Sequence, residues 1–220
     1  MVDIMSERFV RQLEELHVEL ITMGSLCEKA ISLSAKAIQG EGGMTLIGKI
    51  FETEKEIDAQ EKEIENLCMK LLLHEHPVAG DFRDVSAALK MITDLERIAD
   101  QAADICEITL QFGNEEFIKK PEHIEMMAKI AIGMVKDGVH SYINKDLETA
   151  RSLDKRDDRV DELFEKVKEE LISLIKSDPN NADQAILFMM IAKYLERIGD
   201  HAVNIGEWAE YAVTGQHKPG

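Results

Sequence analysis

The chain carries one acidic motif twice, at an interval of 100 residues. Residues 95–100 read Leu-Glu-Arg-Ile-Ala-Asp, and residues 195–200 read Leu-Glu-Arg-Ile-Gly-Asp. Across residues 91–107 and 191–207, eight of seventeen positions are identical. Acidic residues upstream keep the same interval, since Glu54, Asp58, Glu61 and Glu65 are matched by Asp154, Asp158, Asp161 and Glu165. Such self-similarity predicts two related structural units that each carry a carboxylate cluster.

Composition and periodicity favour helices throughout the chain. Hydrophobic residues make up 45% of the 220 residues, aromatic residues only 5%, and there are four prolines. This composition is typical of long, packed helices. From Phe9 to Ala37 small and apolar residues recur at intervals of four and three, which is the seam of a left-handed bundle. The sequence predicts six helices and no strand, with helices at residues 9–37, 45–74, 81–112, 122–144, 147–176 and 182–213.

The repeat groups these helices into an all-α fold of two pseudo-symmetric three-helix bundles. We place the first unit at residues 1–113 and the second at residues 114–220. Pro77 and Gly80 predict the turn between the second and third helices, and residues 177–181 predict the corresponding turn in the second half.

The net charge of −17 restricts the partners of the chain. Nucleic acid is a poor partner because its phosphates require cations on the protein, and adsorption to anionic lipid is disfavoured for the same reason. Three cysteines without a Cys-x-x-Cys pair favour a reducing compartment. The sequence has no apolar run long enough to span a bilayer and no secretory signal at its start. We therefore expect a cytoplasmic protein that reaches the inner face of the membrane only through protein partners.

The acidic residues of each half are predicted to meet across a helix–helix seam. Residues four apart share a helix face, so Glu54 and Asp58 point the same way, as do Glu96 and Asp100. Glu54 and Asp100 are equally distant from Pro77, so an antiparallel hairpin brings the four carboxylates to one level. The second half repeats the arrangement about its own turn, with Asp154, Asp158, Glu196 and Asp200.

Four carboxylates at one level repel one another, and a positive charge must offset the repulsion. Arg97 and Arg197 offer one solution, a solvated acidic face held by ion pairs. Bound metal is the other, because carboxylate oxygens suit hard cations and also hold iron. The residues alone leave Mg²⁺, Mn²⁺, Ca²⁺ and iron open, and each site could hold more than one metal ion. The candidate ligands are Glu54, Asp58, Glu61, Glu96, Asp100 and Asp104 in the first half and Asp154, Asp158, Asp161, Glu196, Asp200 and Asn204 in the second.

Other functional classes compete with a regulatory metal protein. Glu14 and His17 form one Glu-x-x-His, the spacing of di-iron carboxylate bundles, but the required second copy is missing. A metal-storage or metal-dependent hydrolytic bundle is the alternative function. Hydrolysis needs a nucleophile or base beside an open metal position, and no such group accompanies the carboxylates, so no catalytic residue is assigned. A helical interaction module without metal is the third class.

The repeated motifs resemble the signature of the PhoU family, the phosphate-signalling accessory proteins of bacteria. The resemblance lies in residues 93–100, Thr-Asp-Leu-Glu-Arg-Ile-Ala-Asp, and in residues 195–205, Leu-Glu-Arg-Ile-Gly-Asp-His-Ala-Val-Asn-Ile. Residues 76–83, His-Pro-Val-Ala-Gly-Asp-Phe-Arg, also resemble the family's first hairpin turn. The resemblance covers essentially the whole chain in length, repeat and order. Asp104 departs from the pattern, because the family usually has Asn there, as this chain does at Asn204.

The resemblance implies a fold and a function. PhoU proteins consist of two pseudo-symmetric three-helix bundles whose paired Glu/Asp-x-x-x-Asp motifs bind multinuclear metal clusters. For this chain the resemblance implies clusters of divalent or trivalent metal, with iron first and Zn, Mn or Mg as alternatives. They are cytoplasmic, often homodimeric, and not enzymes. The resemblance implies two partners, the ATPase subunit of the Pst phosphate ABC transporter and a PhoR-type sensor histidine kinase. Through these partners, such a protein represses the phosphate regulon and restrains phosphate uptake when phosphate is plentiful.

Overall fold

The computed structural model describes residues 7–40, 43–74, 79–113 and 116–216. This part of the chain contains helices and short connections, without a strand. The helices are α1 (Glu7–Ile38), α2 (Gly43–His74), α3 (Ala79–Gln111), α4 (Glu122–Asn144), α5 (Leu147–Ser177), the 3-10 helix η1 (Pro179–Asn181) and α6 (Ala182–Thr214). The predicted six-helix, all-α fold is confirmed. Gly80 belongs to α3 rather than to a turn, and the predicted turn at Pro77 lies outside the described residues.

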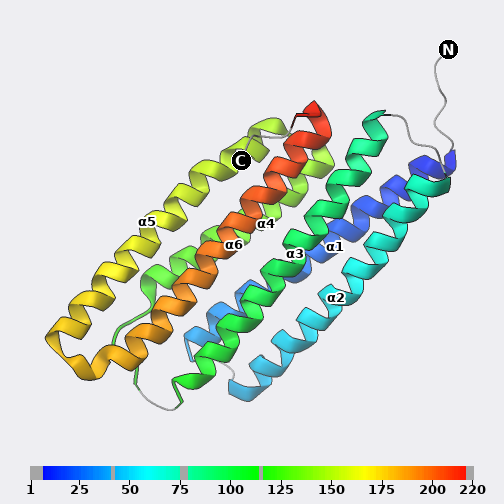
Figure 1. The fold of residues 1–220 in the computed structure, drawn as a ribbon. Coiled ribbons are helices and arrows are strands. Elements are labelled where there is room, and N and C mark those ends of the chain that lie inside the picture. Colours follow the sequence, from blue (N-terminus) through cyan, green and yellow to red (C-terminus); the bar gives the residue numbers. More distant parts are fainter. Residues whose placement is uncertain (1–6, 41–42, 75–78, 114–115, 217–220) are drawn as a thin grey trace.

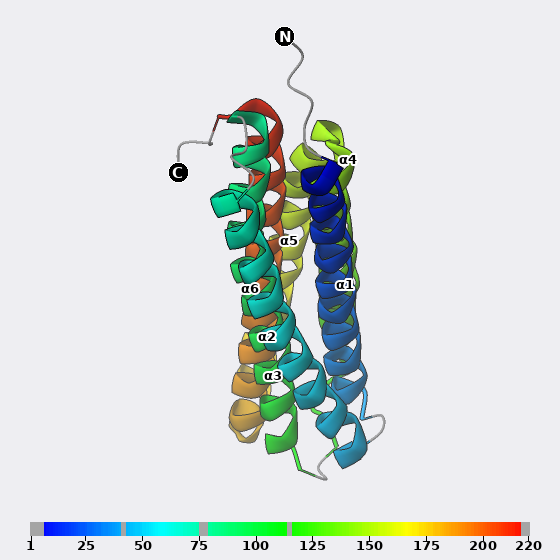
Figure 2. The same cartoon turned by 90° about the vertical axis from the view of Figure 1, so that its right-hand side faces the viewer.

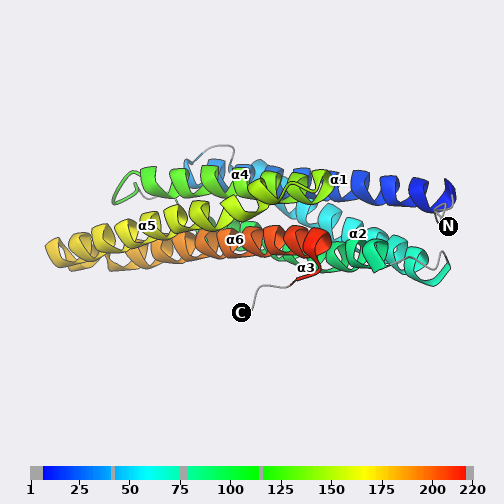
Figure 3. The same cartoon turned by 90° about the horizontal axis from the view of Figure 1, so that it is seen from above.

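The helices form two layers (Figure 3). α5, α6, α3 and α2 lie side by side in one layer, and α1 and α4 cover it. In each half the three consecutive helices pack on one another, which gives the two predicted three-helix bundles. All six helices run lengthwise (Figure 2), so the molecule is elongated. A helix of 32 residues such as α1 is about 48 Å long.

α3 and α6 join the two bundles at the middle of the four-helix layer (Figure 1), and they run antiparallel. Near one end of the pair, a Cβ on Gly215 would lie 3.3 Å from Cδ of Arg83. Near the other end, the rings of Phe112 and Phe188 lie 4.8 Å apart. This register places Asp94 of α3 beside Asn204 of α6, and Asp104 of α3 beside Tyr194 of α6, near the middle of the helix pair.

Local chemistry explains where several helices begin and end. The side chain of Asp146 accepts hydrogen bonds from the backbone N–H groups of Glu148 and Thr149, which otherwise lack partners at the start of α5. Lys145 ends α4 in the left-handed region at φ 54°. Gly215 ends α6 at φ 71°, a conformation that glycine adopts without a steric penalty.

One apolar core runs through both bundles and takes buried residues from all six helices. Phe112 and Phe188 belong to different halves, and Phe117 packs edge-on against both of them. On the side of α1 and α4, the hydroxyl of Tyr142 donates to the carbonyl oxygen of Asp84 at 2.8 Å. The two halves therefore share their core. Among the described residues, no helix is long and apolar enough to cross a membrane.

Candidate metal centres

The first carboxylate cluster lies along the seam between α2 and α3. Burial, followed by repulsion from Asp58 and Asp100, raises the pKa of Glu54. Burial and Asp100 raise the pKa of Glu96, to which Glu61 and Asp58 also contribute. The structure thus brings together the members that the sequence placed there: Glu54, Asp58 and Glu61 on α2, and Glu96 and Asp100 on α3.

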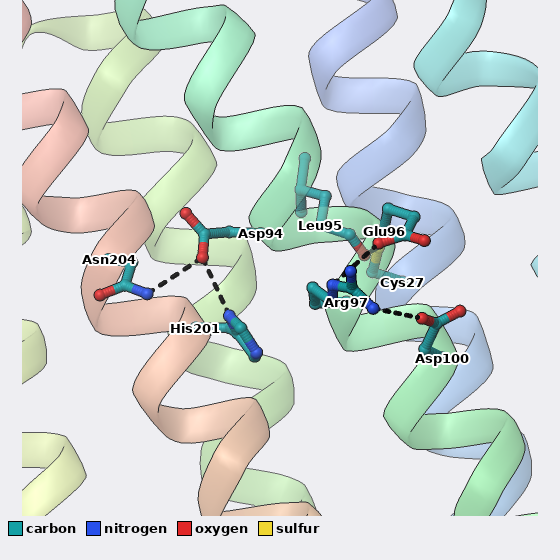
Figure 4. Close-up of polar contacts among 8 residues, drawn as sticks. All are labelled: Cys27, Asp94, Leu95, Glu96, Arg97, Asp100, His201 and Asn204. Carbon is teal, nitrogen blue, oxygen red and sulfur yellow. Dashed lines mark hydrogen bonds and ion pairs between the residues drawn. The ribbon is translucent and has the colours of Figure 1, made fainter.

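Arg97 offsets only part of this negative charge (Figure 4). Its Nε lies 3.5 Å from Oε2 of Glu96, and its Nη1 lies 3.3 Å from Oδ2 of Asp100. The arginine side chain is 56% exposed, and long ion pairs in contact with water contribute little. The pKa values of Glu96 and Asp100 stay raised despite Arg97, mainly because both groups are partly buried. The raised pKa values of Glu96 and Asp100 therefore reflect burial first, with repulsion inside the cluster as a smaller contribution.

The second carboxylate cluster lies along the seam between α5 and α6, and Asp157 is its innermost member. Burial, and then repulsion from Asp200, Asp161 and Glu196, raises the pKa of Asp157 to about 7. Its Oδ1 is buried and accepts no hydrogen bond. A Cβ on Gly199 would lie only 2.5 Å from this oxygen. Because Gly199 has no side chain, the Asp157 carboxylate can occupy the space between α5 and α6.

Asp157 was missed by the sequence analysis, and its position corrects the predicted register of α5. The buried residues Ile50, Ile57 and Ile64 of α2 are matched by Leu153, Val160 and Val167 of α5, at an interval of 103 rather than 100. In this register Asp157 and Asp161 correspond to Glu54 and Asp58.

With this register, Asp157 and Asp161 form the acidic pair of α5 that belongs to the cluster, in place of the predicted Asp154 and Asp158. The latter two side chains are exposed, and Asp158 stays beside the cluster as a contributor to the raised pKa of Asp157 and Asp161. The sequence contained the missing signal, because Val160 precedes Asp161 as Ile57 precedes Asp58.

The opposing cation also differs between the two clusters. Lys193 donates to Oε1 of Glu196 at 2.6 Å. Burial and then Glu196 raise the pKa of Asp200, and Lys193 offsets only part of this shift. Arg197, expected to take this role, has its guanidinium carbon 6.0 Å from the centre of the Tyr194 ring. The cation beside the second cluster is therefore a lysine, one turn earlier in α6 than Arg197.

Asn204 and Asp104 lie between α3 and α6 rather than inside the carboxylate clusters. Asn204 donates from Nδ2 to Oδ1 of Asp94 at 3.0 Å, and Nδ1 of His201 lies 2.9 Å from the same oxygen (Figure 4). Asp104 is hydrogen-bonded to Tyr194 across the same pair of helices. The structure thus does not bring Asn204 into the second cluster. Asp104 still contributes to the raised pKa of Asp100, at the margin of the first cluster.

The single Glu-x-x-His of the sequence does not extend either cluster. His17 packs edge-on against Tyr142, with ring centres 5.8 Å apart, where α1 meets α4. Burial lowers the pKa of His17. This histidine belongs to the joint between the two bundles.

The carboxylate clusters suit metal by their chemistry, although their side chains are not gathered as a ligand set. Among the described residues, no three His, Cys, Asp or Glu side chains converge closely enough to hold a metal ion as they stand. The donors are all oxygens, they repel one another, and one buried oxygen of Asp157 lacks a partner. These are properties that a hard cation would satisfy, so the residues fit a metal.

A family model described as the PhoU domain matches residues 20–109 and, a second time, residues 124–209. The chain belongs to the PhoU family. One match falls inside each half of the molecule, so the internal repeat is a tandem of two PhoU domains. The exact limits of the two units, 1–113 and 114–220, stay a prediction.

Similar proteins span nearly the full length of the chain. A Clostridium acetobutylicum protein named phosphate-specific transport system accessory protein PhoU homolog is 35% identical over 209 residues, with 94% of this chain and 95% of that protein covered. A Deinococcus radiodurans protein of the same name is 30% identical over 198 residues, with 90% and 92% covered.

Solved PhoU structures share the fold. The crystal structure of PhoU from Pseudomonas aeruginosa has a TM-score of 0.88 at 28% identity, and covers 94% of this chain and 100% of that one. The phosphate transport system regulatory protein PhoU from Streptococcus pneumoniae has a TM-score of 0.86 at 25% identity, with 96% and 100% covered.

Proposed function

We propose that this chain is a metal-binding regulatory adaptor of bacterial phosphate homeostasis. Its relatives are named as accessory proteins of the phosphate-specific transport system, which supports a place beside phosphate transport machinery. The observation that carries the proposal is that both PhoU domains present a carboxylate cluster at the same place, between their second and third helices.

Metal would be held by the inner carboxylates of each cluster. In the corrected register these are Glu54, Asp58, Glu96 and Asp100 in the first domain and Asp157, Asp161, Glu196 and Asp200 in the second. Bound iron, or Zn, Mn or Mg in its place, would supply positive charge that offsets the repulsion and ties the two helices of each hairpin together. The chain itself contributes rigid helices that hold the oxygens at one level.

The adaptor would act through partners rather than through catalysis. We propose that it docks, as a cytoplasmic homodimer, on the ATPase subunit of the phosphate ABC transporter and on a PhoR-type sensor kinase. In phosphate-replete cells it would repress the phosphate regulon and restrain uptake. The clusters consist of carboxylates with one lysine or arginine each, and the proposal assigns none of them a catalytic role.

Metal analysis of purified variants tests the first part of this proposal. Chelator-stripped protein is dialysed against iron, manganese, zinc or magnesium, and the retained metal is counted by mass spectrometry. Asp100→Asn should empty the first cluster and Asp200→Asn the second, each lowering the metal content by about half because the clusters are separate. Glu162→Gln is the control, because Glu162 is exposed and paired with Arg159 three residues earlier in α5. Equal metal content in all four proteins would refute metal binding at these residues.

A reporter of the phosphate-starvation response tests the regulatory part. In a deletion strain of the source bacterium, the wild-type chain should restore repression at high phosphate, and the double variant Asp100→Asn/Asp200→Asn should not. Tagged wild-type protein should recover the transporter ATPase or the sensor kinase from solubilised membranes. Phosphate-ester hydrolysis by the metal-loaded protein, abolished in the double variant, would favour the hydrolytic alternative instead.

A further inference from the structure

The outer surface of α6 exposes apolar side chains that the core does not use. Ile186 is 56% exposed and Met190, one turn later, is 41% exposed. Tyr194 follows after another turn and is partly buried against the core. Met190 and Tyr194 line a shallow hollow together with Lys193 and Arg197. We call Ile186, Met190 and Tyr194 the α6 apolar face.

The internal repeat provides a control for this surface. α3 takes the place in the first domain that α6 takes in the second, and at an interval of 100 residues it carries Ser86 and Lys90 where α6 carries Ile186 and Met190. The fold is therefore built equally well with polar residues at these two positions. Adjacent exposed apolar side chains that the fold does not require indicate a contact with another molecule.

Acidic groups flank the α6 apolar face on both sides. Toward α3, Asp104 is hydrogen-bonded to Tyr194, and Glu107 is close enough to act on the same ring. Toward α5 lie Asp161 and Glu196 of the second cluster. Two cations share this surface, since Lys193 is paired with Glu196 and Arg197 lies near the Tyr194 ring. The four acidic groups outnumber them, so the surroundings are acidic on balance, as is the whole chain with its charge of −17.

We propose that the α6 apolar face is a docking site for a basic amphipathic segment of a partner protein. Apolar side chains of the segment would cover Ile186 and Met190, and its Lys or Arg side chains would face Asp104 and Glu107 toward α3. In the metal-free protein they would also face Asp161 and Glu196 toward α5. A second copy of this chain would bring like charge to like charge. The proposal rests on the adaptor role and defines the chemistry of one partner.

Methyl spectra locate the docking site directly. Chelator-treated protein labelled with ¹³C at the methionine methyl groups is titrated with a helical peptide of about 20 residues that carries leucine on one face and lysine on the other. Met69 and Met126 are 45% and 44% exposed and serve as internal references. The Met190 signal should shift saturably while these two stay in place. The same peptide with glutamate for lysine should bind at least about tenfold more weakly, a difference of about 1.4 kcal/mol.

Variants copied from the first domain complete the test. Ile186→Ser and Met190→Lys install the residues of α3 and should weaken peptide binding about tenfold each. Binding is followed at the Met190 methyl for Ile186→Ser and by calorimetry for Met190→Lys, which lacks that methyl group. Ile172→Ser, which removes another exposed apolar side chain, should leave binding unchanged. No saturable shift of Met190, equal shifts at Met69, or unaltered binding to Ile186→Ser would overturn the proposal. Because metal is removed beforehand, failure of the metal proposal leaves this result unaffected.

Discussion

At the scale of single residues, the Asp157 carboxylate is the candidate metal ligand that most clearly destabilises the folded protein. Its carboxylate is half-buried, has an oxygen without a partner and is repelled by four other acids. Unfolding would return it to water and to an ordinary pKa of about 3.9. The folded apo-protein therefore favours the protonated form of this group.

Asp157→Asn should stabilise the chelator-treated protein at high pH only. The pKa of Asp157 is raised to about 7 in the folded state, so its favourable contribution is complete below about pH 4 and is lost as the pH rises through 7. An amide cannot ionise, and at pH 8 the variant should gain about 1–2 kcal/mol, a figure reduced for the partial exposure of the group. Urea unfolding at pH 4, 6 and 8 measures the difference.

Glu162 supplies the matched comparison for this titration, because it is exposed, is paired with Arg159 and does not act on Asp157. Glu162→Gln changes the chain charge by the same amount, so its effect on the free energy of unfolding should be small at all three pH values. A gain for Asp157→Asn that is the same at pH 4 and pH 8 would show that its carboxylate is not destabilised in the folded state.

At the scale of helices, close approach of α5 and α6 depends on Gly206. A Cβ at this position would lie 2.9 Å from the carbonyl oxygen of Ala150 and 2.8 Å from Cδ1 of Leu153. A backbone atom cannot move aside cheaply, so Gly206→Ala should cost about 1–3 kcal/mol. Gly48→Ala is the opposite case. Gly48 lies in α2 with open space around it, and alanine should add about 0.5–1 kcal/mol through helix propensity.

Thermal and urea unfolding of both glycine variants check these values. The two changes are chemically identical, so the contrast isolates the contact between α5 and α6. Equal effects of the same sign at both positions would mean that the helices can separate slightly without loss.

Helices were readable from the sequence because apolar periodicity and turn residues act locally. The bounds of α4 were predicted as observed, and those of the other helices differ by a few residues. The register between α5 and α6 could not be predicted from the 100-residue interval between the two motifs. Asp161 and Asp200 are three residues closer in sequence than Asp58 and Asp100, which shifts the α5 acids by most of a turn.

Asp104 and Asn204 show a second limit of predicting a shared helix face from residue spacing. Each step of four residues advances about 40° beyond a full turn, so two steps from Glu96 or Glu196 rotate the side chain by about 80°. This rotation carries Asp104 toward Tyr194 and Asn204 toward Asp94, on the opposite central helix. Only the packing of α3 on α6 reveals that these residues join the two domains.

At the scale of the whole molecule, two PhoU domains share one core. Phe188 of the second domain is fully buried, and its ring packs against Phe112 of the first and against Phe117. Neither domain could expose this surface to water without losing apolar burial, which contributes roughly 25 cal/mol per Å². The two domains should therefore unfold together.

The chain contains separate reporters for each domain. Cys27, Cys68 and Cys106 are buried in α1, α2 and α3, and the single tryptophan, Trp208, lies in α6. Burial raises the pKa of all three thiols, so they should react with a thiol reagent only after the first domain opens. Thiol labelling and tryptophan fluorescence should give the same urea midpoint. Phe188→Ala, which should cost about 3–5 kcal/mol, should move both midpoints equally, although the substitution lies outside the first domain. A shift of the tryptophan signal alone would mean that the shared core does not couple the domains.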